Sequence, residues 1–506
     1  MFNTMTRLGR FSTIILLVLV SLVCCSMTGD YERRFEGFEP GEVISDDWYG
    51  IYYHDIKVGY DHIVVTRGEL DGVPVVRLDD DGMIRYRLDE FARPTDNTFR
   101  SQVFIAGDDT VLGLFYEQTI MDHLLTEVGL AGDDGHMYLD IYSGGGHERI
   151  KYSLEEGIYP SLAVGYFLVQ QPLEIGSRFE YRVFLENLRV IEDFTAEVTG
   201  LTEIDVDGES MEVFEVVGAV RGLESTSYVT RDGELIRQVS MGEFDQRLES
   251  EETATNMKEI DGITMTSVID FTRIPVDPPL ASPASLDSLS IRIEGIPRGF
   301  SPREGFYQQV EGPDDDGGYV YTIRRAEVNG GPIEIPETYP EGVEACLLPE
   351  IDIESDNERI KETAREILGD VTDPTMSAKM IMDWVYKNVD KRLVDATSAL
   401  DVLSTMEGEC ESHAKLYAAL GRAAGVPTRV VNGIVYVEEM EAFLFHAWNE
   451  VYLGEWVPVD AAFGQFPADV THIKFAEGGG ASVIDVVSLV GSINVTILEV
   501  KSADDE

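Results

Sequence analysis

Pairs of aspartate and glycine divide residues 48–271 into short runs rich in tyrosine, valine, isoleucine and phenylalanine, which favour strands. An Asp-Gly pair suits the two-residue turn of a β-hairpin, because both turn positions need a positive φ. The pairs are Asp71-Gly72, Asp81-Gly82, Asp134-Gly135, Asp207-Gly208, Asp232-Gly233 and Asp261-Gly262. The pattern therefore predicts a mainly antiparallel β domain over residues 40–273.

The first residues differ from the rest of the chain. Arg7 and Arg10 precede an apolar run from Phe11 to Cys25, which is shorter than the ~20 residues of a comfortable membrane span. A basic start followed by such a run predicts that residues 1–25 are a signal peptide or a signal anchor. We therefore expect an exported protein of the periplasm or cell envelope. A membrane tether through this segment, or through a lipid on Cys24 or Cys25, stays open.

The chain beyond residue 273 divides into three further segments. A proline-rich stretch, residues 274–285, predicts a linker. Residues 286–335 contain a few further strands and predict a small connector domain. Helical periodicity begins at Ser355, where Ser355 and Glu358 fit a capping box. Helices and then strands predict an α+β domain over residues 340–506, so we expect a multidomain chain.

Three residues of this last segment suggest catalysis by a thiol. Cys410 lies between Gly408, a helix stop signal, and a new helical run, so we expect it at a helix N-terminus. There the unpaired N–H groups and the helix dipole favour an anion, which predicts a thiol of low pKa. His446 and Asp460 follow on separate strand-like runs. A cysteine, a histidine and an acid supply a nucleophile, its base and the group that orients the base.

The turn between the last two strands decides whether His446 and Asp460 can meet. With the three-residue loop Leu453-Gly454-Glu455, Trp448 lies opposite Asp460 and His446 is its diagonal neighbour. The backbones of such neighbours are roughly 7–8 Å apart, which an imidazole and a carboxylate can bridge. A two-residue loop would place them on opposite faces. A catalytic pair therefore predicts an odd-numbered loop or a bulge at Gly454.

Residues 398–473 resemble the transglutaminase-like superfamily, a papain-related set of thiol enzymes, and in particular its exported prokaryotic branch. The matching runs are Ala399-Leu400-Asp401-Val402-Leu403, Leu420-Gly421-Arg422-Ala423-Ala424-Gly425-Val426-Pro427-Thr428-Arg429, His446-Ala447-Trp448, Trp456-Val457-Pro458-Val459-Asp460 and Thr471-His472-Ile473. The family usually has aspartate before the cysteine and Thr-Glu after it, where this chain has Glu409 and Glu411-Ser412. This departure puts the substrate preference in doubt more than the catalysis.

The resemblance implies an α+β papain-like domain that cleaves or transfers the acyl groups of amide bonds in a peptide or protein substrate. Cys410 would form a thioester, with His446 as its partner and Asp460 orienting the ring. The thioester passes to water in a peptidase or amidase, and to an amine in a cross-linking transferase. The backbone N–H of Cys410 is the natural oxyanion donor. Neither a cofactor nor a metal is expected for this chemistry.

Three other residues are expected to support the site. His413 lies one helical turn after Cys410, which fits a supporting role better than that of the base. Trp448 is expected to line the cleft or the core, and Glu409 immediately precedes the nucleophile. We expect His472 to be a loop or core residue. The remaining histidines do not have the spacing of a metal site.

Two other functions stay open. The protein could be an envelope binding or scaffold protein that has kept the fold without the activity, or a calcium-regulated transferase. Cys346 could form a disulfide with Cys410, which would disable the enzyme. We favour the interpretation that Cys346 is a small buried apolar residue beside Leu347 and Leu348.

The charge limits the partners of the protein. It carries 93 acidic and 39 basic residues, for a formal net charge of −54. A surface of that sign repels phosphate groups. Nucleic acid and anionic lipid are therefore expected to be poor partners for the body of the protein.

Overall fold

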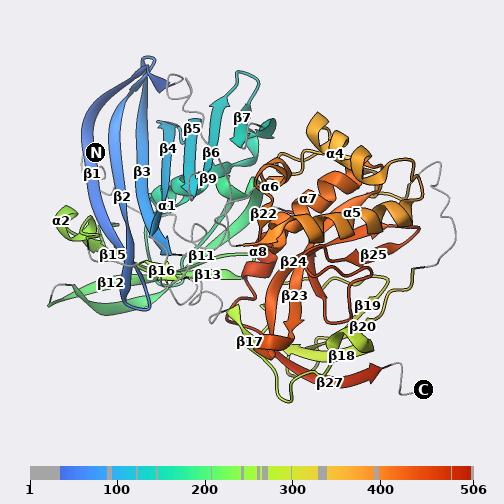
Figure 1. Ribbon diagram of the computed structural model, residues 1–506. Helices are drawn as coiled ribbons and strands as arrows, with labels where there is room; N and C mark the ends of the chain where they lie inside the picture. Colours follow the sequence, from blue (N-terminus) through green and yellow to red (C-terminus); the bar gives the residue numbers. More distant parts are fainter. Residues whose placement is uncertain are drawn as a thin grey trace. The chain divides into compact units, whose positions relative to one another are not determined.

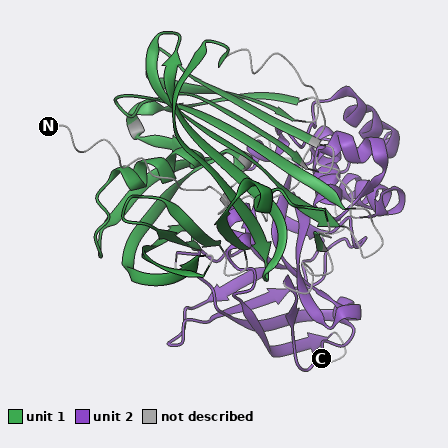
Figure 2. Ribbon diagram, turned by 90° about the vertical axis from the view of Figure 1, so that its left-hand side faces the viewer, with its two compact units in different colours: residues 1–266 green, residues 267–506 purple. Residues whose placement is uncertain are grey.

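The computed structural model describes residues 35–502 except for the short stretches 88–93, 121–122, 144–145, 207, 241–243, 259–261, 265–271, 298, 329–338, 393–397 and 480. The chain forms two compact units, residues 1–266 and 267–506 (Figure 2). The segment predicted as a signal peptide or anchor, residues 1–25, lies outside the described part. Among the residues that are described, no helix has the length and apolar character needed to cross a membrane.

The first unit is built on one sheet of 16 strands, in which almost every strand pairs antiparallel with its neighbour in sequence. This confirms the predicted mainly antiparallel β domain. Two pairings are parallel, those of β9 with β10 and of β16 with β3. The strands are β1 (Phe38–Tyr53), β2 (Ile56–Leu70), β3 (Val73–Arg87), β4 (Thr95–Ala106), β5 (Val111–Ile120), β6 (His123–Ala131), β7 (His136–Ser143), β8 (Gly146–Ser153), β9 (Ile158–Pro160), β10 (Arg178–Leu185), β11 (Val190–Val206), β12 (Glu209–Val220), β13 (Leu223–Val229), β14 (Leu235–Ser240), β15 (Phe244–Glu249) and β16 (Ile263–Thr264).

Three of the Asp-Gly pairs lie in turns, Asp71-Gly72, Asp134-Gly135 and Asp232-Gly233, while Asp207 and Asp261 lie outside the described residues. Asp71 and Gly72 join β2 to β3 with φ values of 49° and 81°, as the two-residue turn requires. The prediction is wrong for Asp81-Gly82, which lies inside β3. A Cβ on Gly82 would lie 2.3 Å from Cζ of Phe99. This glycine therefore permits the close approach of an aromatic ring within the sheet.

Helix α1 (Ser161–Gln170) interrupts the strands of the first unit, and the sequence does not predict it. All residues from Leu162 to Val169 are buried, so the segment has no polar face and its periodicity fits a buried strand equally well. The carboxylate of Glu186 accepts hydrogen bonds from N and Oγ of Ser161, at 3.1 and 2.6 Å. Glu186 thereby binds the first residue of the helix. A shorter helix, α2 (Glu251–Ala254), follows β15.

A row of polar side chains is buried in this sheet. Asp80, Ser101, Tyr116 and Glu127 are successive cross-strand neighbours on β3, β4, β5 and β6. Burial raises the pKa of Asp80 and of Glu127 well above the usual range, and neighbouring carboxyls raise both further. Burial also raises the pKa of Glu186 to about 7. Asp80 and Glu127 therefore hold their protons to higher pH in the folded unit than ordinary carboxyl groups do.

The second unit contains two main sheets. In the central sheet the order is β17-β24-β23-β26, and β25 pairs with β24. The other sheet has the order β19-β20-β18-β27, and β21 and β22 form a separate parallel pair. The strands are β17 (Ile274–Pro275), β18 (Leu286–Glu294), β19 (Gln308–Glu311), β20 (Tyr319–Arg324), β21 (Asp390–Lys391), β22 (Glu407–Gly408), β23 (Thr428–Val437), β24 (Ala442–Tyr452), β25 (Trp456–Val459), β26 (Ile473–Glu477) and β27 (Asn494–Ser502).

The compact units differ from the segments predicted from the sequence. Residues 274–285, predicted as a linker, include β17, which pairs with β24 of the central sheet. Residues 286–335, predicted as a connector domain, contribute β18 to a sheet that also holds β27 from the C-terminal end. Both segments therefore lie within the second unit.

Helix α7 (Cys410–Ala423) is the central helix of the second unit. It contacts α4 (Glu358–Leu368), α5 (Pro374–Asn388) and α6 (Ala399–Thr405), and it packs on β23 and β24 (Figure 1). Leu416 and Leu420 are fully buried on its apolar side. Helix α8 (Ala481–Val487) follows β26.

The starts of the helices follow their capping residues. Ser398 and Asp401 form a capping box at α6, and Asp373 caps α5. The predicted start at Ser355 is wrong, because α4 begins at Glu358. The side chain of Asn357 caps that helix by accepting a hydrogen bond from the backbone N of Arg359 at 2.9 Å.

Candidate active site

Cys410 is the first residue of α7, as the sequence predicts. Glu409 caps this helix, since its carboxylate accepts hydrogen bonds from the backbone N of Glu411 at 2.8 Å and of Ser412 at 3.0 Å. On β24, Nδ2 of Asn449 donates to the carbonyl oxygen of Ala414 at 3.0 Å. This bond joins the helix to the strand that carries His446.

The thiol of Cys410 interacts with two groups. Its Sγ donates to Oε2 of Glu409 at 3.2 Å. Burial raises the pKa of Cys410 well above its usual value, and Glu409 and Glu411 raise it further, while the backbone N–H of Ala447 acts in the opposite direction. The expected low pKa is therefore wrong for this structure. The capping carboxylate places a negative charge beside the thiol, and this charge opposes the helix dipole.

Replacing Glu409 by glutamine is expected to lower the pKa of Cys410. Glutamine keeps an oxygen that can accept from the helix N-terminus, but it removes the charge that disfavours the thiolate. A shift of one pH unit would speed labelling by iodoacetamide about tenfold near neutral pH. The measurement is the rate of labelling of Cys410, read by mass spectrometry. Glu407→Gln, which removes a carboxylate paired with Arg392 at 2.9 Å, is the control. Unchanged or slower labelling in Glu409→Gln would contradict the assigned role.

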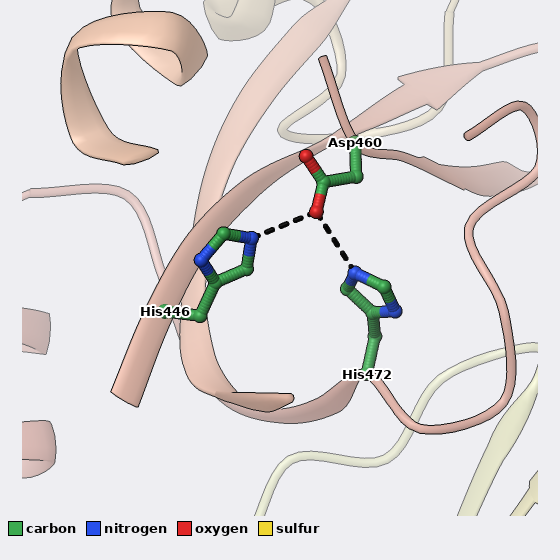
Figure 3. A group of neighbouring side chains, drawn as sticks. All are labelled: His446, Asp460 and His472. Atoms are coloured by element: carbon green, nitrogen blue, oxygen red, sulfur yellow. Dashed lines mark hydrogen bonds and ion pairs between the residues drawn. The ribbon is translucent and has the colours of Figure 1, made fainter. Parts of the chain in front are cut away.

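His446 and Asp460 are in direct contact. Tyr452 pairs with Trp456, so the loop between β24 and β25 has the three residues Leu453-Gly454-Glu455, which confirms the predicted register. Nε2 of His446 lies 2.7 Å from Oδ2 of Asp460 (Figure 3). Because this bond uses Nε2, Nδ1 is the ring nitrogen left to exchange a proton with a reacting group.

Two bonds hold the Asp460 carboxylate besides that of His446. The backbone N of Phe463 donates to Oδ1 at 2.8 Å. Nε2 of His472 lies 3.0 Å from Oδ2, the same oxygen that contacts His446 (Figure 3). Burial opposes the charge of Asp460, but the two histidines keep the pKa of this carboxyl well below its usual value. Asp460 is therefore a charged acceptor in a site that excludes water.

His472 has a larger place in the site than the sequence predicts. It is a buried residue of the loop before β26, as expected, but its bond to Asp460 is not apparent from the sequence. Burial would lower its pKa, yet hydrogen bonds with Asp460 and Asp469 raise the pKa of His472 to about 9. The signal that could have indicated the role is its position in the Thr471-His472-Ile473 run that matches the family pattern.

His446, Asp460 and His472 could in principle hold a metal ion. Among the described residues, each of the three offers one possible ligand atom, and these atoms lie within 4.8 Å of one another. Their contacts of 2.7 and 3.0 Å are hydrogen-bond distances. Two ligands of a tetrahedral zinc ion, each about 2.0–2.1 Å from the metal, would be roughly 3.3 Å apart. The observed geometry fits a carboxylate that accepts two imidazole N–H groups.

Of the residues predicted to support the site, Trp448 lies beside the pair and His413 lies in α7. Trp448 is buried, with its ring 6.2 Å from that of His446 and 5.2 Å from that of His472. The ring of Phe463 stacks on His446 at 4.8 Å, a contact that the sequence does not indicate. His413 is buried in α7, where Nδ1 lies 2.7 Å from the carbonyl oxygen of Glu409. It is therefore bonded to the residue that caps the helix.

Cys346 does not pair with Cys410, because both thiols are free. The expectation that Cys346 is buried beside leucines needs correction. Its side chain is only partly buried, and Leu348 is 61% exposed. The segment forms a short 3₁₀ turn, residues 344–347, whose side chains are only partly covered.

An ion-pair network fixes β24 close to the site. Glu450 is fully buried and accepts from Nζ of Lys474 at 3.0 Å, from Nε of Arg429 at 2.7 Å and from the hydroxyl of Tyr307 at 2.6 Å. Burial would raise the pKa of Glu450, but Lys474 and Arg429 bring it below its usual value. The network joins β24 to β23 and to β26, the strand that follows His472.

The helix-borne Cys410, the strand-borne His446 and the buried Asp460 all lie in the part of the chain that matches a family model. Residues 361–461 match the family model of the transglutaminase-like superfamily, so this chain carries a transglutaminase-like domain.

Two curated proteins are similar to the chain. Kyphoscoliosis peptidase of Mus musculus is 24% identical over 223 residues, which cover 40% of this chain and 31% of that protein. An uncharacterized protein of Haemophilus influenzae is 31% identical over 146 residues, covering 23% of this chain and 38% of that protein. The chain thus spans about a third of the length of these relatives.

Among solved structures, the periplasmic domain of TgpA from Pseudomonas aeruginosa is 16% identical, with a TM-score of 0.25. The likeness covers 38% of this chain and 87% of that domain.

Proposed function

We propose that the second unit is a thiol hydrolase or acyltransferase that acts on amide bonds of peptide-like substrates. The observation that carries the proposal is the His446–Asp460 bond of 2.7 Å, together with the contact between the Cys410 thiol and the backbone N–H of Ala447, the residue after His446 on β24. The transglutaminase-like domain and the similarity to a protein named a peptidase support the same class.

The proposed reaction starts with proton transfer from Sγ of Cys410 to Nδ1 of His446. The thiolate attacks the carbonyl carbon of the substrate, and the backbone N–H of Cys410 donates to the resulting oxyanion. The C–N bond then breaks as His446 returns its proton to the departing amine, which leaves a thioester on Cys410. Attack by water, or by a second amine, releases the acyl group and restores the thiol. Asp460 orients the His446 ring throughout.

One observation favours a second candidate, an inactive binding protein of the cell envelope. The thiol donates its hydrogen bond to Glu409, and burial together with that carboxylate raises the pKa of Cys410. A thiol kept protonated in this way is a poor nucleophile until a substrate or a movement of Glu409 releases it. For either function we propose export through residues 1–25, which places the protein in the periplasm or cell envelope.

Trapping the acyl-enzyme tests the proposal. The full chain is incubated with a panel of glutamine-containing peptides and a peptide thioester, with and without a fluorescent primary amine. Intact-mass and peptide analysis should find the acyl mass on Cys410 and should not find it in Cys410→Ala. Release as acid indicates a hydrolase, and release as amide a transferase. If Cys410 forms no adduct with any donor while the protein stays folded, the inactive binding protein is the better conclusion.

A further inference from the structure

One oxygen atom of Asp460 accepts hydrogen bonds from two imidazoles. Oδ2 lies 2.7 Å from Nε2 of His446 and 3.0 Å from Nε2 of His472 (Figure 3). His472 and Asp460 are both fully buried. The proposed reaction uses His446 and Asp460 and gives no task to His472.

The loop before β26 holds His472 in one orientation. Nδ1 of His472 lies 3.1 Å from the carbonyl oxygen of Asp469, and 3.4 Å from Oδ1 of the same residue. Asp469 is in turn fixed by the backbone N and the hydroxyl of Thr471, at 2.9 and 2.6 Å, and by Nε2 of Gln465 at 2.9 Å. With Nδ1 bound to Asp469, Nε2 of His472 is directed at Asp460.

We propose that His472 is a positioning residue of the site, whose imidazolium fixes the Asp460 carboxylate and offsets its charge toward His446. The inference rests on the proposed function, because it gives His472 a task in the Cys410 reaction. The residues then form a line of alternating charge during catalysis: thiolate, His446 cation, Asp460 anion, His472 cation and Asp469 anion.

The offset matters because His446 must both accept and return a proton. An uncompensated Asp460 anion in this buried site would hold the proton on His446 strongly, and His446 would return it slowly to the departing amine. The His472 cation weakens this hold. The titratable groups that face His472 are Asp460 after β25, Asp469 in its own loop, and His446 on β24, whose ring centre is 5.9 Å away. The hydrogen bonds that raise the pKa of His472 to about 9 keep it charged through neutral pH.

The test needs no substrate. The rate of alkylation of Cys410 by iodoacetamide is measured from pH 5 to 10.5 in the full chain, with Cys346 as an internal control. For a thiol paired with an imidazolium, the alkylation rate rises in two steps as pH increases. The step at higher pH reports loss of the imidazolium proton. His472→Gln keeps an N–H donor for Asp460 but removes the charge. We expect the upper step to move up by about one pH unit in this variant.

His472→Asn separates positioning from charge. Asparagine is too short to reach Asp460, so we expect the same upward shift together with an overall rate at least threefold lower. His62→Gln is the control, since His62 also contacts a carboxylate, Asp46 at 2.8 Å, but lies in the first unit. A melting curve establishes that each variant is folded.

Two results would overturn the inference in different ways. In the first result, the wild type gives two steps, and His472→Gln multiplies the rate by the same factor at every pH without moving either step. His472 is then only structural, and the proposed function stands. If the wild type gives a single step that His446→Ala leaves unchanged, the thiol is not paired, and the proposed function fails together with the inference.

Discussion

Replacing His446 by alanine is expected to slow the turnover of an amide substrate by about a thousandfold or more at neutral pH. The variant removes the ring that is bonded to Asp460 and carried by β24, the strand whose Ala447 backbone contacts the thiol. Without it, the thiol has no base, and the departing amine has no acid to protonate it. The measurement is kcat/KM for the best peptide found by acyl-enzyme trapping.

The matched control for this experiment is His62→Ala. Its ring also bonds a carboxylate, Asp46 at 2.8 Å, but in the first unit. Activity within about twofold of the wild type is expected for the control. Activity of His446→Ala within tenfold of the wild type would show that another group deprotonates Cys410. Glu409 would then be the first candidate, because it is the group that the thiol contacts.

The second large effect is on stability. Glu450→Gln is expected to lower the free energy of unfolding of the second unit by about 3 kcal/mol. Glutamine keeps the shape of the side chain but removes the charge that compensates Lys474, which is 1% exposed. Lys474 would then have Glu477 at 2.7 Å as its ion-pair partner. Urea unfolding followed by tryptophan fluorescence measures the change, since three of the four tryptophans lie in this unit.

The same variant has a predicted pH dependence. The pKa of Glu450 is lower in the folded protein, so its contribution is fully present above the pKa of an ordinary glutamate, about 4.3, and is lost as pH falls further. The difference between wild type and Glu450→Gln should therefore shrink in acid. Lys379→Ala, which breaks a surface pair with Asp383 at 3.3 Å, is the control and should cost under about 1 kcal/mol. An equal loss in both variants would contradict a special role for the buried network.

Local sequence signals predicted the parts of the site that depend on neighbouring residues. Gly454, with its φ of 90°, marked the three-residue loop and thereby the register that brings His446 to Asp460. Gly408 and the apolar stripe after Cys410 marked the start of α7. In the first unit the Asp-Gly pairs predicted hairpins, because a turn is determined by the few residues that form it.

What the sequence did not predict depends on distant segments or on the reach of one side chain. Helix α1 is apolar on every side, so its sequence fits a buried strand as well as it fits a helix. The bond between His472 and Asp460 follows from the way that β25 and β26 are placed in the sheet. The low pKa of Cys410 was predicted from the helix dipole alone. That prediction misses Glu409, whose carboxylate caps the helix and also contacts the thiol. Each of these features needs the folded structure.

The buried row of the first unit changes the meaning of the formal charge. A net charge of −54 counts every acidic side chain as an anion, which describes the unfolded chain. In the folded unit burial raises the pKa of Asp80 and of Glu127, so both hold their protons to higher pH than in the unfolded chain. Folding therefore takes up protons and unfolding releases them. These two carboxyl groups therefore make the stability of this unit fall as pH rises above the ordinary range of carboxyl groups.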